Sequence, residues 1–376
     1  MRIAFLCKRR YMGKDVILDR YARLYEIPYQ LARLGHVVRG FCLSYHGDAD
    51  GIWAHESPPG QLTWESRSLG RSVLPALATY PQHLLRQLRA FAPDVLIGAS
   101  DIPHVVLGAW LARRLRVPYA ADLYDNFEGF GQARIPGMVP LLHRAVRGAD
   151  LVTTTSEPLR ELVVDTYRAR GQVVAMPSTV DKAVFRPLER GACRRALGLP
   201  EGARLVGTAG GLHRDKGVGA LYTAWPAIAA AEPDAHLVLA GPVERAFPPP
   251  ADERVHYLGQ LPHARTAELF NALDVGVIYL RDTPFGRYCF PQKAYEMLAC
   301  RLPIVAARIG VMPQLLASAP DGLYRADDVA DLARAVLAQL AHPQSAQVPI
   351  DDWSHVVSRL DVHLRALVAA AHLPLP

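Results

Sequence analysis

The chain has 376 residues, of which 50% are hydrophobic and 21% are charged, with a net charge of +6 and five cysteines. This length favours two domains, because a single hydrophobic core stops growing well below it. No apolar run approaches the ~18 residues needed to span a bilayer, and no basic stretch is interleaved with the stacking aromatics of a nucleic-acid surface. The start, MRIAFLCKRR, predicts a β-strand and not a signal peptide. We expect the cysteines to be reduced thiols of a cytoplasmic protein.

The positive charge is concentrated in the N-terminal half of the chain. Residues 1–187 hold 24 Lys and Arg against 17 Asp and Glu, a net charge of +7, whereas residues 188–376 hold 18 against 19. A basic half can face anionic lipid or a phosphate-bearing acceptor. A general preference for Arg explains the same count without any partner, and the sequence leaves both interpretations open.

Apolar strand patterns alternate with helical patterns along the chain. The predicted strands are residues 3–7, 37–42, 95–99, 119–123, 151–155, 205–208, 236–240, 275–279 and 304–307. The predicted helices are residues 21–34, 102–115, 332–340 and 353–370. This alternation is typical of right-handed βαβ units and predicts two doubly wound α/β domains, with a break near Met176–Pro187.

A glycine-rich segment, GTAGGLHRDKG (Gly207–Gly217), joins a predicted strand to a predicted helix. Gly210 and Gly211 let the backbone approach a ligand, and a helix N-terminus presents unpaired N–H groups to an anion. Arg214 and Lys216 add two positive charges, so the segment predicts a diphosphate site. It matches neither the dinucleotide fingerprint nor the Walker A motif. The alternative is a glycine-rich turn with solvated basic residues.

The segment CFPQKAYEMLACRLPIVAA (Cys289–Ala307) predicts a loop, a helix with one glutamate, and a buried strand. Pro291 suits the first helical turn, and Pro303 ends the helix because proline disfavours helical backbone at the residue before it. Glu296 lies early in the helix, where a carboxylate can accept hydrogen bonds from ribose hydroxyls. The alternative is an ion pair with Lys293, three residues earlier on the same helix face.

A polar cluster follows the predicted strand at residues 119–123. It contains Tyr124, Asp125 and Glu128, and the carboxyl ends of strands are where doubly wound sheets bind ligands. Helix capping and loop solvation are the alternative. No His or Cys is spaced to join these carboxylates, so no metal site is predicted.

A second polar group follows the predicted strand at residues 95–99. Ser100 or Asp101 is expected to cap the next helix, because short polar side chains accept hydrogen bonds from the first N–H groups of a helix. His104 is expected on the surface of that helix rather than in catalysis.

Five segments, in this order, resemble glycosyltransferase family 4, the retaining enzymes of GT-B fold. They are VVAMPSTVDKAVFRP, AGGLHRDKG, VHYLGQLPHARTAELFNALDVGVIYL, FPQKAYEMLACRLPIVAA and DDWSHVVSRL. They resemble the family's inter-domain segment, its phosphate loop, its loop against the nucleotide base, its donor-site helix and strand, and its final helix. The similarity covers nearly the whole chain.

The resemblance implies two doubly wound Rossmann-like domains facing a central cleft. Residues 1–180 would bind the acceptor, residues 188–350 the sugar nucleotide, and residues 351–376 would form a helix that packs back on the N-terminal domain. It also implies that a sugar passes, with its configuration retained, from a nucleotide-diphosphate sugar to a saccharide or lipid-linked saccharide. No metal or other cofactor is required in the family. The context would be polysaccharide or glycolipid biosynthesis, with peripheral contact at the anionic inner membrane face.

Site residues follow from the resemblance by position. Lys216 would hold the donor phosphates and Glu296 the ribose. The nucleotide-binding set is Gly210, Gly211, Lys216, Pro291, Lys293 and Glu296. The catalytic set is Arg214, Lys216, Tyr124 and Asp125, in which the two basic residues stabilise charge on the leaving diphosphate and the other two line the acceptor side.

Three positions depart from the family pattern. Tyr288 stands where the donor-site helix usually carries a second glutamate, Gly211 replaces the arginine of the phosphate loop, and Tyr124 stands where many members have a histidine. A tyrosine is a poor base near neutral pH. Two alternatives therefore stay open: a sugar-nucleotide epimerase of the same fold, and a catalytically silent subunit that binds a sugar nucleotide.

Overall fold

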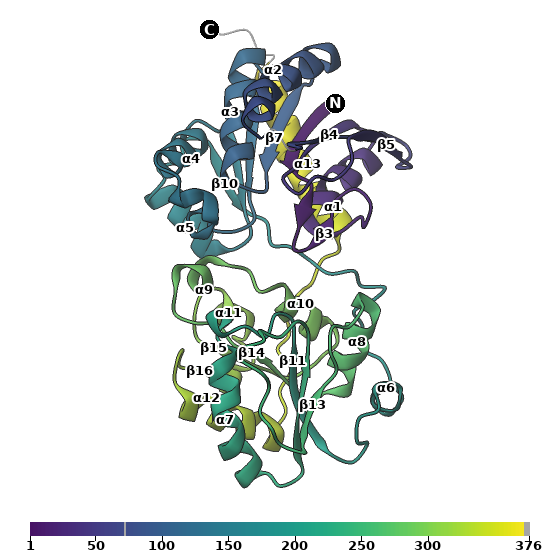
Figure 1. Cartoon of the computed structure of the whole chain (residues 1–376), viewed down its shortest axis with the longest axis vertical. Coiled ribbons are helices and arrows are strands. Elements are labelled where there is room, and N and C mark those ends of the chain that lie inside the picture. The colour runs from purple at the N-terminus through teal and green to yellow at the C-terminus, as the bar shows by residue number, and fades with distance from the viewer. Residues whose placement is uncertain (71–72, 372–376) are drawn as a thin grey trace. The chain divides into compact units, whose positions relative to one another are not determined.

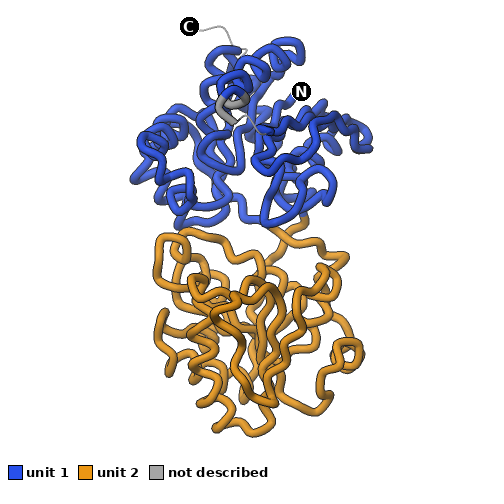
Figure 2. Tube along the Cα trace, viewed as in Figure 1, with its two compact units in different colours: residues 1–178, 353–376 blue, residues 179–352 orange. Residues whose placement is uncertain are grey.

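The structure is a computed structural model that describes residues 1–70 and 73–371, and it contains two compact units (Figure 1). Unit 1 comprises Met1–Ser178 together with the C-terminal segment from Trp353, and unit 2 comprises Thr179–Asp352 (Figure 2). Unit 2 is thus one continuous stretch of chain inserted into unit 1.

Unit 1 is built on an eight-stranded sheet of order β10-β9-β8-β7-β1-β4-β6-β5, in which only β5 runs antiparallel to its neighbour. The strands are β1 (Arg2–Lys8), β4 (Val37–Ser44), β5 (Gly51–His55), β6 (Gln61–Ser68), β7 (Val95–Ala99), β8 (Tyr119–Leu123), β9 (Leu151–Thr154) and β10 (Gln172–Ala175). A small ribbon pairs β2 (Arg10–Tyr11) with β3 (Lys14–Asp15). The central strands are almost wholly buried, as expected of a parallel sheet covered on both faces.

The helices of unit 1 cover this sheet. They are α1 (Ala22–Arg33), α2 (Val73–Phe91), α3 (Ile102–Leu115), α4 (Met138–Arg147), α5 (Glu157–Asp165) and α13 (Trp353–Ala371), with short 3-10 turns η1 (Phe127–Gly129) and η2 (Gly131–Arg134). The last helix, α13, buries Trp353, Val357 and Leu364 in the same core cluster as the first strand. His36 Nε2 donates to Asp361 of α13 at 2.7 Å, which fixes the helix to the chain start.

A fully buried ion pair ties three elements of unit 1 together. Arg23 in α1 has no exposed surface, and its Nε and Nη2 atoms donate to the carboxylate of Asp122 in β8 at 2.5–3.1 Å. Arg23 Nη1 donates to the carbonyl of Met176 at 2.7 Å, and the Thr153 hydroxyl donates to Asp122 at 2.6 Å. Every charged group therefore has a partner, which is the condition under which a buried charge is tolerated.

Unit 2 is built on a six-stranded parallel sheet of order β13-β12-β11-β14-β15-β16. The strands are β11 (Arg204–Ala209), β12 (Ala235–Ala240), β13 (Val255–Tyr257), β14 (Val275–Ile278), β15 (Ile304–Ala307) and β16 (Leu323–Tyr324). The helices are α6 (Arg190–Leu197), α7 (Val218–Ala231), α8 (His263–Ala272), α9 (Pro284–Tyr288), α10 (Gln292–Ala299), α11 (Met312–Leu315) and α12 (Val329–Ala341), with turns η3 (Arg214–Lys216) and η4 (Pro320–Gly322). The predicted α/β fold class is confirmed, since both sheets are parallel apart from β5 and their strands alternate with helices.

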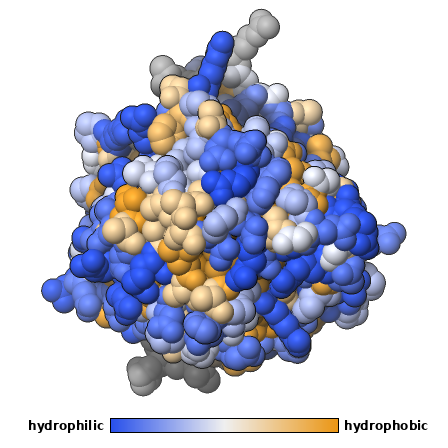
Figure 3. All heavy atoms as spheres, turned by 90° about the horizontal axis from the view of Figure 1, so that it is seen from below, coloured by the Kyte–Doolittle hydropathy of each residue, from blue (hydrophilic) through white to orange (hydrophobic). Residues whose placement is uncertain are grey.

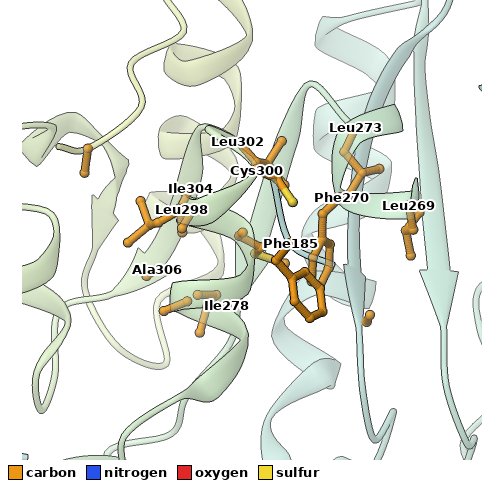
Figure 4. Packing of buried hydrophobic residues seen from close by; sticks show 14 of the residues in the cluster. Phe185, Leu269, Phe270, Leu273, Ile278, Leu298, Cys300, Leu302, Ile304 and Ala306 are labelled. Atoms are coloured by element: carbon orange, nitrogen blue, oxygen red, sulfur yellow. The ribbon is translucent and has the colours of Figure 1, made fainter. Parts of the chain in front are cut away.

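One core cluster of unit 2 lies between α8, α10 and the sheet (Figure 4). Phe185, from the irregular segment that enters the unit, packs its ring 6.2 Å from that of Phe270 in α8. Leu298 and Cys300 close the cluster from the end of α10 and the residues after it. The segment after residue 178 is therefore anchored by an aromatic side chain in the core.

The face drawn in Figure 3 is mostly hydrophilic, with a small apolar patch surrounded by hydrophilic residues. Among the described residues, no helix is long and apolar enough to cross a membrane. All five cysteines are buried and outside disulfides, and Cys7 and Cys42 on neighbouring strands have their sulfur atoms 3.5 Å apart.

We expect Arg23→Met to lower the free energy of unfolding by about 3–5 kcal/mol, because it leaves the Asp122 carboxylate buried without its counter-charge. The measurement is urea unfolding followed by circular dichroism. The control is Arg67→Met, which removes a half-exposed partner 3.7 Å from Asp50 and is expected to cost about 0–1 kcal/mol. Equal effects of the two variants would contradict the structural weight given to the buried pair.

Candidate active site

The strands β11 and β12 of unit 2 both end in a glycine that brings two backbones close together. Gly210 has φ +115° and Gly241 has φ +125°, a region that side chains rarely adopt. The Gly210 N–H donates to the Ala240 carbonyl at 2.9 Å. A Cβ atom at Gly241 would lie 2.1 Å from the Gly210 carbonyl oxygen, so only glycine fits there. The carboxyl end of the sheet therefore presents bare backbone to a ligand.

Two lysine ammonium groups converge on this backbone. A Cβ atom at Gly210 would lie 3.3 Å from Lys293 Nζ, and one at Gly211 would lie 3.2 Å from Lys216 Nζ. Lys293 Nζ also lies 4.8 Å from the ring centre of Tyr279, whose hydroxyl donates to the Gly211 carbonyl at 3.1 Å. The two predicted lysines and two predicted glycines are thus brought together in space.

The electrostatics of this group favour an anion. Burial lowers the pKa of Lys293 to about 8. The charge of Lys216 contributes to this shift, and the charge of Glu296 opposes it. Because burial disfavours the charged form of Lys293, an anion bound beside this lysine would stabilise its ammonium form. Two ammonium groups beside backbone that carries no side chain form a natural receptor for phosphate oxygens.

The glycine-rich loop is followed by the N-terminus of α7. Gly217 has φ +98° and α7 begins at the next residue, as predicted from the sequence. A Cβ atom at Gly217 would lie 2.9 Å from Cγ of Arg281, so the stem of this arginine lies against the start of the helix. The positive end of the α7 dipole adds to the field of the two lysines.

Arg214 is oriented by an aromatic ring. Its guanidinium carbon lies 4.7 Å from the ring centre of Phe247, and that ring stacks on Tyr222 of α7 at 5.3 Å. The Arg214 N–H donates to Glu244 at 3.1 Å. The contacts that the structure gives this arginine are thus with Phe247 and Glu244, and no described contact joins it to the lysine pair.

Glu296 lies in the middle of α10, which begins at Gln292 directly after Pro291. Burial raises the pKa of Glu296 to about 7, although the charge of Lys293 opposes the shift. Among the described residues, no ion pair within 4.0 Å joins Glu296 to Lys293. The helix-surface ion pair considered from the sequence is therefore not formed, and the carboxylate is left for another donor.

In unit 1, Lys8 and Tyr124 meet at the carboxyl ends of β1 and β8. Lys8 Nζ donates to the Tyr124 hydroxyl at 3.0 Å and lies 5.6 Å from its ring centre. Burial lowers the pKa of Lys8, with Asp101 and Asp125 opposing the shift. Burial also raises the pKa of Tyr124, so this phenol stays protonated. Since its oxygen accepts from Lys8, its O–H can donate to a ligand.

Asp125 is adjacent to this pair. Burial raises the pKa of its carboxyl to about 7, against the hydrogen bond from the Asn126 N–H and the charge of Lys8. A carboxylate that titrates near neutral pH can accept a proton from a hydroxyl group. Glu128, predicted in the same cluster, instead accepts from His143 Nε2 at 2.7 Å and holds the loop to α4.

The prediction that His104 lies on a helix surface is wrong, because this residue is only 1% exposed. Asp101 caps α3 by accepting from the His104 N–H at 3.1 Å, and the same oxygen accepts from its Nδ1 at 2.6 Å. The Tyr45 hydroxyl donates to the other oxygen at 3.0 Å. Burial opposes ionisation of Asp101, but His104 outweighs it and lowers the pKa. Tyr45, from a loop distant in sequence, covers the histidine.

Sequence reasoning missed Lys8, Tyr279 and Arg281 as parts of these two groups. Lys8 carried one signal, since it directly follows the predicted strand at residues 3–7, where doubly wound sheets bind ligands. Tyr279 and Arg281 follow β14 in the same way. Among the described residues, no group of three or more His, Cys, Asp or Glu side chains is placed to hold a metal ion.

Comparisons with known proteins relate this chain to glycosyltransferases. The family described as "Glycosyl transferase 4-like domain" matches residues 22–179, and that described as "Glycosyl transferases group 1" matches residues 203–342. The D-inositol 3-phosphate glycosyltransferase of Stackebrandtia nassauensis is 29% identical over 324 residues, which are 77% of this chain and 69% of that protein. Further alignments with D-inositol 3-phosphate glycosyltransferases cover from 50% to 70% of those proteins.

Solved structures share the whole architecture. Sucrose-phosphate synthase from Thermosynechococcus elongatus has a TM-score of 0.75 at 19% identity, covering 98% of this chain and 99% of that one. Anabaena HepE, solved in complex with UDP, has a TM-score of 0.66 at 18% identity, covering 99% and 97%. At this level of identity the likeness concerns the fold alone.

Two doubly wound units with a cationic glycine loop in the second define a sugar-transferring enzyme of the GT-B fold. The two family matches together span most of the chain, and the chain belongs to glycosyltransferase family 4.

Proposed function

We propose that this protein is a retaining glycosyltransferase that moves a hexose from a nucleotide-diphosphate sugar to a saccharide or lipid-linked saccharide. The observation that carries the proposal is the convergence of Lys216 and Lys293 on the bare backbone of Gly210 and Gly211. A nucleotide diphosphate has the charge for this group and a ribose for the unpaired Glu296.

The proposed chemistry is electrostatic. As the bond between sugar and diphosphate breaks, negative charge grows on the leaving group. Lys216, Lys293 and the N-terminus of α7 are already positioned there, so they stabilise that charge without reorganising. No bound metal is needed in this scheme, since two ammonium groups and a helix dipole supply the positive charge. Arg214 is retained as a candidate for the same role.

On the acceptor side we assign Tyr124 and Asp125, with Lys8 as a positioning residue. Lys8 fixes the phenol by donating to its oxygen, so the phenolic O–H can donate to an acceptor hydroxyl. Asp125 can then take up the proton, or the leaving phosphate can take it directly. Tyr288, where a second donor-binding glutamate is usual, leaves the sugar end of the donor with fewer assigned contacts.

The test of the function is incubation with a panel of UDP- and GDP-hexoses in the absence of acceptor. We expect slow release of free hexose, whose initial anomer by NMR is the one present in the donor. An isomerised donor that still carries its nucleotide would indicate an epimerase instead. Nucleotide binding without turnover over a broad acceptor panel would indicate a silent subunit.

The donor site predicts a pH dependence of UDP binding. An anion binds the protonated form of Lys293, so affinity falls as the pH rises through about 8. The ribose hydroxyls bind the ionised form of Glu296, so affinity falls as the pH drops below about 7. Calorimetry should therefore give the tightest binding between these two values.

Variants separate the two limbs of this profile. Lys293→Met should remove the alkaline limb and Glu296→Gln the acid limb, relative to the parent at each pH. Lys216→Ala should weaken UDP binding roughly tenfold or more throughout, equivalent to about 1.4 kcal/mol. Lys14→Met, which removes an exposed charge in unit 1, should leave the profile unchanged. A parental profile in Lys293→Met would refute the role of that lysine.

We further propose peripheral contact between unit 1 and an anionic membrane. Residues 129–149 contain no Asp or Glu but include Arg134, Arg144 and Arg147. Leu141 lies in α4 and is 44% exposed, and Ile135 lies just before this helix and is 55% exposed. Apolar side chains flanked by arginines suit the boundary between headgroups and acyl chains.

This contact is tested by flotation with vesicles of phosphatidylglycerol and phosphatidylcholine. Ile135→Ser combined with Leu141→Ser should lower the bound fraction several-fold, whereas Val362→Ser, at a residue that is 66% exposed in α13, should not. Added salt should weaken binding because it screens the arginines. Binding that ignores both salt and anionic lipid would exclude the proposed contact.

A further inference from the structure

Unit 2 contains a cavity at the far end of α10 from Pro291. Its volume is about 310 Å³, at the lower end of the range of about 300–1,000 Å³ typical of small-molecule sites. It is lined by three stretches of unit 2: the segment after Thr179, the end of α10, and the segment before Asp352. Lys216, Lys293 and Glu296 are not among its lining residues.

The charge around this cavity is of one sign. Lys182, Arg186 and Arg301 line it, and none of the eleven described lining residues is an Asp or Glu. Within the described part of the chain, none of these three side chains takes part in an ion pair. Elsewhere in unit 2 arginines commonly have carboxylate partners, as in the pairs of Arg194 with Asp274 and of Arg334 with Asp331.

The walls of the cavity are fixed by packing. Phe185 is 1% exposed and joins the core cluster that Figure 4 shows, together with Leu298. On the opposite wall, Ala346 is 5% exposed in the same cluster. The Gln347 N–H donates to the Ser318 hydroxyl at 2.9 Å. The cationic side chains therefore extend from backbone that is already in place, which lowers the cost of binding.

We propose that this cavity binds a small phosphorylated molecule, separately from the donor site. Three cations without carboxylates attract a polyanion, and the two guanidinium groups can each hold phosphate oxygens in a bidentate manner. Ser345 and Gln347 supply neutral hydrogen-bonding groups in the same lining. Two of the lining stretches lie near the two ends of unit 2, so a bound ligand would bridge the first and last segments of this unit.

The test is calorimetric titration of the full chain with pyrophosphate at fixed ionic strength. We expect two classes of site, because pyrophosphate also suits the proposed donor loop. Lys216→Ala should remove one class, and Arg186→Gln combined with Arg301→Asn should weaken the other at least tenfold. Arg301 has φ +58°, and asparagine tolerates this backbone.

The matched control is Arg116→Asn, which removes an exposed arginine of φ +60° in unit 1. If the double variant binds pyrophosphate like this control, the cavity is not a phosphate site and the proposal is overturned. If the parent shows a single class of site, which Lys216→Ala leaves intact and the double variant weakens, the donor assignment fails while the cavity assignment stands. Should the double variant fold poorly, the single Lys182→Gln variant gives the same comparison, with several-fold weakening expected and parental affinity overturning the proposal.

Discussion

The buried pair of Arg23 and Asp122 is the constraint on which the geometry of unit 1 depends. Asp122 lies two residues before Tyr124, so the ion pair holds the end of β8, where the residues proposed for the acceptor side begin. Its third partner, the Met176 carbonyl, lies two residues before the chain leaves unit 1. One guanidinium therefore fixes both the start of the loop that carries Tyr124 and a connection between the units. A fully paired buried charge contributes specificity of this kind more readily than net stability.

Both units place a lysine at the carboxyl end of their sheet, but the charge around that lysine differs between them. In unit 2, two lysine ammonium groups lie beside bare glycine backbone, and burial lowers the pKa of Lys293. In unit 1, Lys8 is balanced by Asp101 and Asp125, and the group presents a neutral phenol and a carboxyl that titrates near neutrality. An anionic leaving group and a neutral hydroxyl nucleophile call for these two environments.

Much of the fold could be predicted from the sequence, because buried parallel strands read as apolar runs and Gly217 marks the start of α7. The edge strands β5, β10, β13 and β16 and the inner strand β6 were missed, since they are short, partly exposed or interrupted by polar residues and lack such runs. At the site, Gly210, Gly211, Lys216, Lys293 and Glu296 could be proposed from loop and helix patterns. The burial of His104 could not, because it depends on Tyr45, 59 residues away. The stacking of Arg214 on Phe247 likewise depends on a contact that local sequence does not encode.

The position of α13 has a consequence for the order in which the protein is made. Its apolar face completes the core that begins with β1, and Asp361 binds His36. During synthesis, unit 2 is whole once Asp352 has left the ribosome, whereas the first 178 residues still lack a helix of their own core. Domains usually fold in the order in which they emerge. Here the unit whose synthesis begins first is completed after unit 2, because the α1 face of its core has no partner until α13 is made.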